Sequence, residues 1–241
     1  MHKRKLLGLF GITFLTVAMV VTVLGIVVKH EPNFYRQSQV PPSDARKELA
    51  ATFFNRFGQM VLDRKARMED WRCDATEAQL NSFFEEAFMQ QSEAEGLRKL
   101  GISSPSVCLE DNNVRLAFRY GSGWFSTVIS YNLKIWLVPK EANVIAVEIR
   151  SARAGALPIS KQSILNQLSD FARKQNYKVT LYRHEGNPVA MIDLEADQQH
   201  PKSVLTTLQI GVNSLTIRGK TLEHAVAPLD PTKAAQVDRT P

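Results

Sequence analysis

The most pronounced pattern along the chain is an uninterrupted apolar run near its start. Residues 6–28 contain no charged side chain, and Lys3, Arg4 and Lys5 lie immediately before them. At about 1.5 Å per residue, a helix of this length reaches about 34 Å, which exceeds the roughly 30 Å hydrocarbon core of a bilayer. Because basic residues that flank a membrane helix stay in the cytoplasm, the pattern predicts a single-pass protein of the bacterial inner membrane. Residues 1–5 would be cytoplasmic, and everything after residue 28 would be extracytoplasmic.

The alternative interpretation of this run is a cleaved signal peptide. Such peptides have an apolar region of about 7–15 residues followed by a cleavage site between small residues. Here the run is longer, and Val28 is followed by Lys-His-Glu-Pro without an Ala-x-Ala pattern. The sequence therefore favours an uncleaved anchor.

Helical periodicity appears after a connector, residues 29–42, that is rich in proline. We expect its two aromatic residues, Phe34 and Tyr35, to lie at the membrane–water interface. Ser43 is a favourable N-cap, and apolar residues then recur at helical spacing as far as about residue 70. A capping box that begins at Thr76 predicts a second helix, and residues 160–174 predict a third.

Between the second and third of these helices, and again after the third, the periodicity changes to two, which is typical of strands in antiparallel sheets. The clearest example is residues 124–138, where Ile129 and its i+2 neighbours form an apolar face and Lys134 lies on the other face. The remaining expected strands cover residues 107–109, 114–120, 144–151, 177–183, 189–194 and 204–217. The predicted fold class is α+β, with one extracytoplasmic domain over residues 43–222. It would contain a long antiparallel meander packed by two or three amphipathic helices, and residues 223–241 would form a disordered tail.

The charge distribution gives no support for nucleic-acid binding. The formal net charge is +6, and the three basic residues at positions 3–5 supply half of it. Acidic and basic residues are well mixed in the rest of the chain, without a basic stripe that carries interleaved aromatic residues. We therefore expect the membrane, rather than nucleic acid, to be a partner.

The candidate chemistry is sparse. Gly-x-Ser-x-Gly, Walker A and dinucleotide-binding motifs are all absent from the sequence, so we predict no catalytic residue, although carboxylates paired across the fold stay untested. The five histidines are isolated, and Cys-x-x-Cys is absent, which predicts no metal site and no cofactor. The two cysteines, Cys73 and Cys108, allow one intramolecular disulfide; otherwise they are two small core residues.

The candidate ligand-binding residues are aromatic and methionine side chains, which adapt to flexible apolar chains. Phe53, Phe57 and Met60 lie on the first predicted helix, and Trp124 and Trp136 lie on the less apolar face of the long strand. Each of the five also has an interpretation as core packing. Two tryptophans on a nominally exposed face need a cover, which a helix, a second sheet, a lipid or a protein partner would provide.

Three segments resemble a known group of proteins: Thr-Glu-Ala-Gln-Leu-Asn-Ser-Phe from Thr76, Pro-Ser-Val-Cys-Leu from Pro105, and Gly-Ala-Leu-Pro-Ile from Gly155. Over about residues 70–195, the chain resembles uncharacterised bacterial membrane-anchored proteins of the YpmS type. More distantly, it is similar to LmeA-type envelope proteins that bind phospholipid. The resemblance implies a related fold and, by analogy, lipid binding, and it carries over no site residue.

Two functional hypotheses follow. The first is a non-enzymatic, membrane-anchored envelope protein that binds lipid or another apolar ligand. The second is a structural scaffold that docks an envelope protein complex through the same surfaces.

Overall fold

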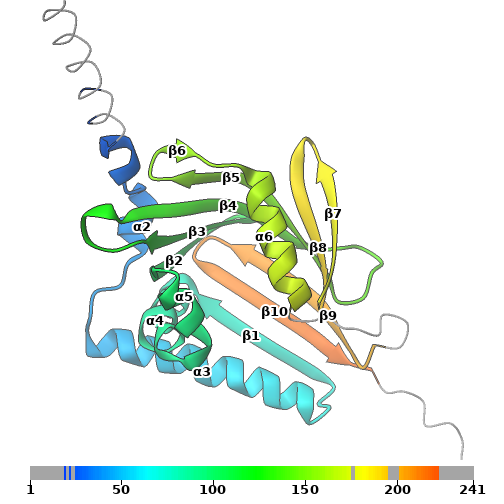
Figure 1. The fold of residues 1–241 in the computed structure, drawn as a ribbon. Coiled ribbons are helices and arrows are strands. Elements are labelled where there is room, and N and C mark those ends of the chain that lie inside the picture. Colours follow the sequence, from blue (N-terminus) through cyan, green and yellow to red (C-terminus); the bar gives the residue numbers. More distant parts are fainter. Residues whose placement is uncertain (1–18, 20–21, 23–24, 175–176, 195–200, 223–241) are drawn as a thin grey trace, which may run out of the picture.

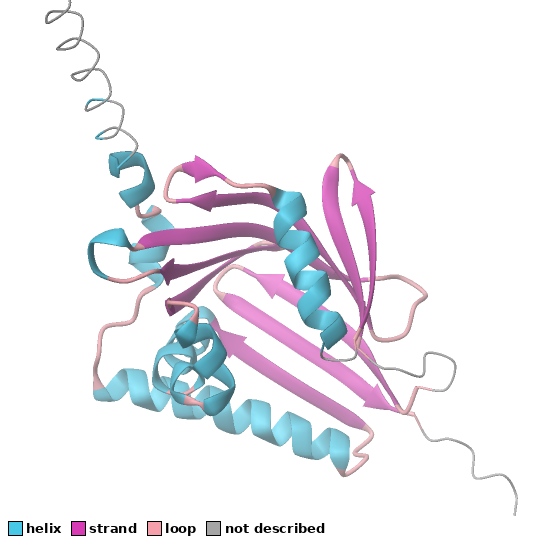
Figure 2. Ribbon diagram, in the orientation of Figure 1, coloured by secondary structure: helices cyan, strands magenta, loops and turns pink. Residues whose placement is uncertain are grey.

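The computed structural model of the chain describes residues 19, 22, 25–174, 177–194 and 201–222. Within this part, no helix combines the length and the apolar composition that crossing a bilayer requires. Most of the predicted membrane segment, residues 6–28, and the predicted tail, residues 223–241, lie outside the described residues. The described part is an α+β fold of antiparallel strands with helices packed against them, as the sequence predicts (Figure 1 and Figure 2).

The strands form two antiparallel sheets. The larger sheet has the order β2-β3-β4-β5-β8-β7, with the short strand β6 paired to β5, and the smaller sheet has the order β1-β10-β9. The strands of the larger sheet are β2 (Ile102–Glu110), β3 (Asn113–Tyr120), β4 (Thr127–Leu137), β5 (Val144–Ala154), β6 (Leu157–Pro158), β7 (Lys178–His184) and β8 (Asn187–Asp193). Those of the smaller sheet are β1 (Asp70–Thr76), β9 (Ser203–Gly211) and β10 (Ser214–Thr221).

The helices comprise the three that the sequence predicts, of which the first two end earlier than expected, and two short ones that it does not predict. They are α2 (Asn33–Ser38), α3 (Asp44–Lys65), α4 (Glu77–Glu86), α5 (Glu95–Lys99) and α6 (Lys161–Lys174), with 3₁₀ turns η1 (Phe88–Gln90), η2 (Ser92–Ala94) and η3 (Gly123–Phe125). The Ser43 hydroxyl accepts from the backbone N–H of Arg46 at the start of α3. The predicted capping box is confirmed, since Thr76 and Gln79 satisfy each other's backbone N–H groups.

Hydrogen bonds from turn residues of one sheet to strands of the other hold the two sheets together. The backbone N–H of Asn112 donates to the carbonyl of Ile210 at 3.0 Å, and that of Asn213 donates to the carbonyl of Leu109 at 3.0 Å. Further along, the side-chain amide of Asn143 accepts from the N–H of Leu205 and donates to a carbonyl on β9. These contacts fix the smaller sheet across one end of strands β2–β4, so the two sheets enclose a common interior.

The smaller sheet differs from the sequence prediction in two respects. The single strand expected over residues 204–217 is in fact the hairpin β9–β10, because Asn213 adopts a left-handed conformation with φ of 55° and closes a tight turn. Strand β1 was not predicted, although its burial alternates along its length. Its Trp71 ring occupies the position that a Cβ on Gly219 would fill, so glycine is required there.

The connector is folded onto the domain, and it supplies the missing cover for part of the larger sheet. Tyr35 of α2 is fully buried against Ala117 of β3 and Val128 of β4, and its hydroxyl donates to the Ser104 carbonyl at 3.0 Å. The expectation that Tyr35 lies at the membrane interface was therefore wrong. Its ring instead covers the sheet face opposite to the main apolar one.

Candidate functional site

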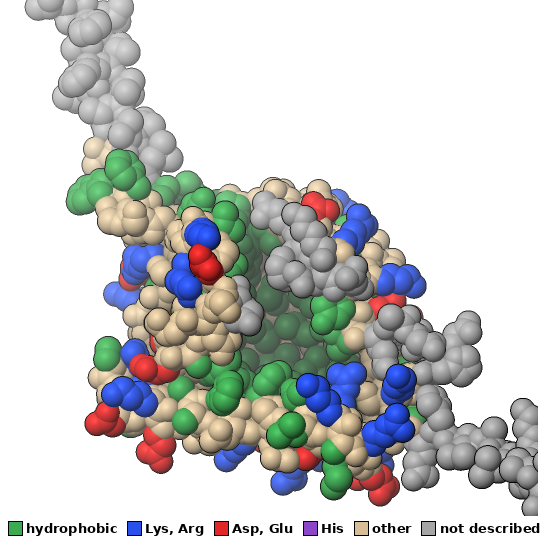
Figure 3. Space-filling view, turned by 60° about the horizontal axis from the view of Figure 1, so that its bottom comes forward, with side chains coloured by type: hydrophobic (Ala, Val, Ile, Leu, Met, Phe, Trp, Pro, Cys, Tyr) green, Lys and Arg blue, Asp and Glu red, His purple; other side chains and the backbone are tan. Residues whose placement is uncertain are grey.

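A hollow lined by hydrophobic side chains opens on one face of the molecule (Figure 3). It lies over the sheets, between helices α3 to α5 on one side and α6 on the other (Figure 1 and Figure 3). Most soluble proteins bury such a surface, and a large concave apolar surface usually marks a binding site. The hollow is therefore the candidate functional site.

The floor of the hollow is built on strand β4. Side chains two residues apart on a strand share a face, and five on β4 are apolar and only half-buried. We call these five residues the β4 stripe: Ile129, Tyr131, Leu133, Ile135 and Leu137.

The register extends this apolar surface across the sheet. The partners of the β4 stripe on β3 are Val114, Leu116 and Phe118. Its partners on β5 are Ile145, Val147, Ile149, Ala152 and Ala154. Beyond β5, the same face continues onto β8 through Ala190 and Ile192. None of these described positions carries a charged side chain, so this part of the floor offers no partner for a charged ligand group.

Two separate apolar clusters form the walls. On the α3–α4 side, Phe53 packs with Leu80, and its ring meets that of Phe83 edge-on at 5.0 Å. On the α6 side, Leu165 packs on Ile149, which is 1% exposed, together with residues of β7 and β8. Leu133 touches both clusters, which places it at the centre of the floor.

The smaller sheet adds a third apolar surface. Leu208 of β9 pairs with Ile217 of β10, which in turn pairs with the buried Cys73 of β1. Leu208 and Ile217 are half-buried, and they lie on the same face as Cys73. The hollow is thus bounded by apolar side chains from both sheets.

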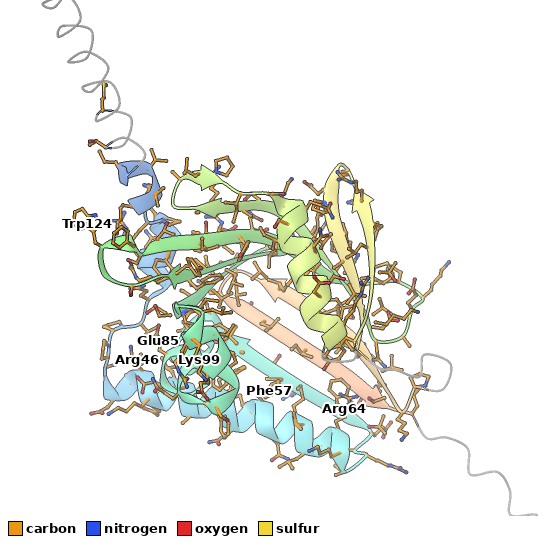
Figure 4. The ribbon with its side chains drawn as sticks, viewed as in Figure 1. Arg46, Phe57, Arg64, Glu85, Lys99 and Trp124 are labelled. Atoms are coloured by element: carbon orange, nitrogen blue, oxygen red, sulfur yellow. The ribbon has the colours of Figure 1, made fainter. Side chains whose placement is uncertain are left out.

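The structure distributes the five sequence-predicted ligand residues among three places. Phe53 and Met60 belong to the α3-side cluster, and the Phe57 ring, 42% exposed, stacks on Phe53 at 5.9 Å. Trp136 projects from the opposite face of β4, near His184 and Lys134. Trp124 lies in turn η3, on a different side of the molecule from Phe57 (Figure 4). Only the three α3 residues are therefore brought together beside the hollow.

Sequence reasoning identified the β4 stripe as an inward face but treated it as packed core. The signal for its position was present in the alternation of residues 124–138. What the sequence could not supply was the spacing of the helices over that face. Alternation shows which residues share a face, and it does not show whether another element covers them.

A buried carboxylate on the opposite side of the sheet is held by its neighbours. Glu148 of β5 is 2% exposed, and it accepts a hydrogen bond from the Asn187 amide at 2.6 Å. Lys161, at the start of α6, donates to the same amide at 2.6 Å. This network ties α6 to the β7–β8 hairpin.

Within the described ranges, no three His, Cys, Asp or Glu side chains are grouped closely enough to hold a metal ion.

A polar pocket of about 460 Å³ lies between the connector and α4. Two of the polar side chains that line it, Arg46 and Asn81, already have partners. Arg46 pairs with Glu86 at 2.5 Å, and Asn81 exchanges two hydrogen bonds with the backbone of Val107. The Asn81 amide therefore acts as an extra strand partner that fixes α4 on β2.

Both cysteine thiols are free in the structure, so the disulfide that the sequence allowed is not formed. Cys73 is buried in the α3-side cluster. Val107 and Leu109 face the core, so Cys108, which lies between them on β2, is on the opposite face of the strand, close to Glu77. Burial and the neighbouring carboxylates of Glu77 and Glu110 raise the pKa of Cys108 to about 11.

This raised pKa gives a testable expectation for thiol reactivity. The thiolate is the reactive species, so at pH 8 Cys108 should react with iodoacetamide about a hundredfold more slowly than an ordinary thiol. The rate should keep rising as the pH increases toward the raised pKa. Peptide mass spectrometry of the native chain measures it. Glu77→Gln keeps an oxygen acceptor for the Leu109 N–H but removes the charge, so it should speed the reaction. An unchanged rate in that variant would contradict the electrostatic part of the explanation.

Comparisons with known proteins leave the family open. No protein-family model matches the chain, and no solved structure matches it. The chain is 32% identical over 111 residues to the metalloprotease TldD homolog of Haemophilus influenzae. The match covers 41% of this chain and 23% of that protein, so the chain spans about a quarter of the relative's length. The matched region covers too little of either protein to show membership of a family.

Proposed function

We propose that the chain is an envelope protein, anchored by residues 6–28 in the bacterial inner membrane, whose hollow binds the apolar chain of a lipid. The observation that carries the proposal is the half-buried β4 stripe, whose central residue Leu133 packs against the apolar clusters on both sides of the hollow. Water against such a surface is unfavourable by about 25 cal/mol for each Å² of apolar area. An apolar ligand would remove that cost.

The shape of the stripe favours an extended ligand over a compact one. From Ile129 to Leu137, a strand extends about 26 Å at about 3.3 Å per residue. A flexible hydrocarbon chain matches such a narrow path, whereas a compact apolar molecule would cover only part of it. The lack of charged residues on the described floor supports an uncharged ligand segment.

The place where the stripe begins supports a lipid as the source of that chain. Ile129 lies two residues from Thr127, whose hydroxyl donates to the carbonyl of Val28 at 2.6 Å. Val28 is the last residue of the predicted membrane segment. The stripe therefore begins at the end of the domain nearest to the proposed anchor.

The proposal is for a binding protein, without a catalytic step. It rests on the absence of catalytic motifs from the sequence and on the apolar character of the site. The resemblance to YpmS-type and LmeA-type proteins agrees with it by analogy. The competing proposal is a scaffold, in which an envelope protein fills the hollow.

Photocrosslinking in membranes distinguishes these alternatives. The full chain is reconstituted in vesicles that contain a phospholipid with a diazirine in its acyl chain. After illumination, peptides of β4 and of the β9–β10 hairpin should carry lipid. Crosslinks confined to residues 1–31 would show an anchor without a lipid site and would favour the scaffold. A phospholipid with the diazirine on its headgroup serves as the control, and it should label the stripe much less.

A further inference from the structure

The β3–β4 turn carries the two most exposed large apolar side chains in the described part of the chain. Trp124 is 83% exposed and Phe125 is 89% exposed. Both belong to the 3₁₀ turn η3, and Figure 4 shows Trp124 projecting from the end of the sheet. Large aromatic side chains are rarely so exposed without a binding partner.

The turn is a well-bonded structure that holds these side chains outward. The Ser126 hydroxyl donates to the carbonyl of Gly123 at 3.0 Å. The backbone N–H of Phe125 donates to the carbonyl of Ser122 at 3.2 Å. Gly121, at φ of 84°, takes a left-handed conformation that lets the chain enter the turn. The exposure of Trp124 is therefore a consequence of a defined backbone.

The same turn is bonded to the residues that end the predicted membrane segment. Lys29 donates to the carbonyl of Ser126 at 3.0 Å, and its ammonium group lies 5.5 Å from the centre of the Trp124 ring. The backbone N–H of Ala156 donates to the carbonyl of Val27 at 2.9 Å. Beside it, Gly155 allows the backbone of Val28 to approach so closely that a Cβ at this position would overlap it.

These contacts fix the level of the turn relative to a bilayer. The uncharged run ends at Val28, and Lys29 is the first charged residue after it. If residues 6–28 span the membrane, the outer interface lies at the level of Val28 and Lys29. A turn that is hydrogen-bonded to Lys29 must then lie at that interface as well.

We propose that turn η3 inserts Trp124 and Phe125 into the outer interface of the bilayer, beside the anchor. The inference rests on the proposed anchor and goes beyond the lipid site in the hollow. Tryptophan suits this place because its ring is apolar and its N–H remains available to headgroups and water. Phe125 adds a purely apolar side chain, and Lys29 can direct its charge toward lipid phosphates.

Insertion would attach the domain to the membrane at two points. A single helix leaves a domain free to tilt, whereas the anchor and the turn together restrict its orientation. The end of the β4 stripe at Ile129 would then face the bilayer surface. The hollow would be held where a lipid chain can reach it without crossing water.

Tryptophan quenching tests the insertion directly. The full chain is reconstituted in vesicles of phosphatidylcholine and phosphatidylglycerol, with or without bromine atoms on the upper part of the acyl chains. Wild-type emission should fall in the brominated vesicles, because the heavy atoms quench a ring at that depth. Trp124→Phe should abolish this loss, while the matched control Trp136→Phe should retain it. Trp124 is exposed, so its replacement should leave the melting temperature unchanged.

The outcomes separate the turn from the anchor. Alkaline carbonate washing of the same vesicles reports on the anchor. A chain that resists the wash but shows equal emission in both vesicles would overturn the insertion and leave the anchor standing. Quenching that persists in Trp124→Phe would also overturn it, since another tryptophan would face the membrane. Release by carbonate would remove the anchor, and the insertion would fall with it.

Discussion

Replacing Tyr35 with alanine is expected to lower the free energy of unfolding by about 3–5 kcal/mol, the range for truncating a large aromatic side chain in a core. Tyr35 is fully buried, and it packs on Ala117 and Val128, while Phe34 of the same helix is only partly buried against this cluster. Truncation would leave a cavity between the connector and the sheet. It would also leave the Ser104 carbonyl without its donor.

Two control variants separate packing from other effects. Tyr35→Phe removes only the hydroxyl, so it should cost about 1 kcal/mol, close to the value of one hydrogen bond. Gln37→Ala changes an exposed residue of the same helix and should have an effect within about 0.5 kcal/mol. Thermal denaturation of the full chain in mild detergent, followed by near-UV circular dichroism, measures all three. Equal melting temperatures for Tyr35→Ala and Gln37→Ala would mean that the connector does not pack on the domain.

This packing changes where a soluble fragment should begin. The sequence suggested a domain that starts at residue 43, after a connector with aromatic residues at the membrane interface. In the structure, the connector covers Val128, which is only 1% exposed. A fragment that starts at residue 43 would uncover that face. One that starts at residue 29 would retain Tyr35.

The elements that the sequence predicted correctly have local causes. Helix α4 begins at a capping box, whose two hydrogen bonds involve residues only three apart. Strand β4 follows from alternation over its length. Each of these signals is contained within about ten residues, so one sequence suffices to recognise it.

The elements that were missed depend on residues distant in sequence. Strand β1 lies between two helices, and its partner is β10, roughly 140 positions later. Tyr35 is aromatic and follows the predicted membrane segment, so its local context predicts the interface, while its actual neighbours come from β3 and β4. The hollow itself arises from the distance between α4 and α6, which no local pattern encodes.

Filling the hollow is expected to block the proposed ligand with little loss of stability. Leu133→Trp places an indole at the centre of the floor, between the two apolar clusters. Excluding only two methylene groups of an acyl chain, at about 0.8 kcal/mol each, would lower the affinity about tenfold. Acyl-chain photocrosslinks on the β9–β10 hairpin should therefore fall by about tenfold in vesicles that contain this variant.

The stability of the same variant reports whether the space is open. An indole added to a filled core forces its neighbours apart and costs about 1–3 kcal/mol, whereas an open hollow accommodates it with little change in melting temperature. Lys134→Trp is the matched control, since it adds the same ring on the opposite face of β4 and should leave the crosslinks unchanged. If Leu133→Trp melts much lower than Lys134→Trp, the floor is packed core. If it remains stable and keeps its crosslinks, the lipid chain lies elsewhere, because an indole and an acyl chain cannot occupy the same volume above Leu133.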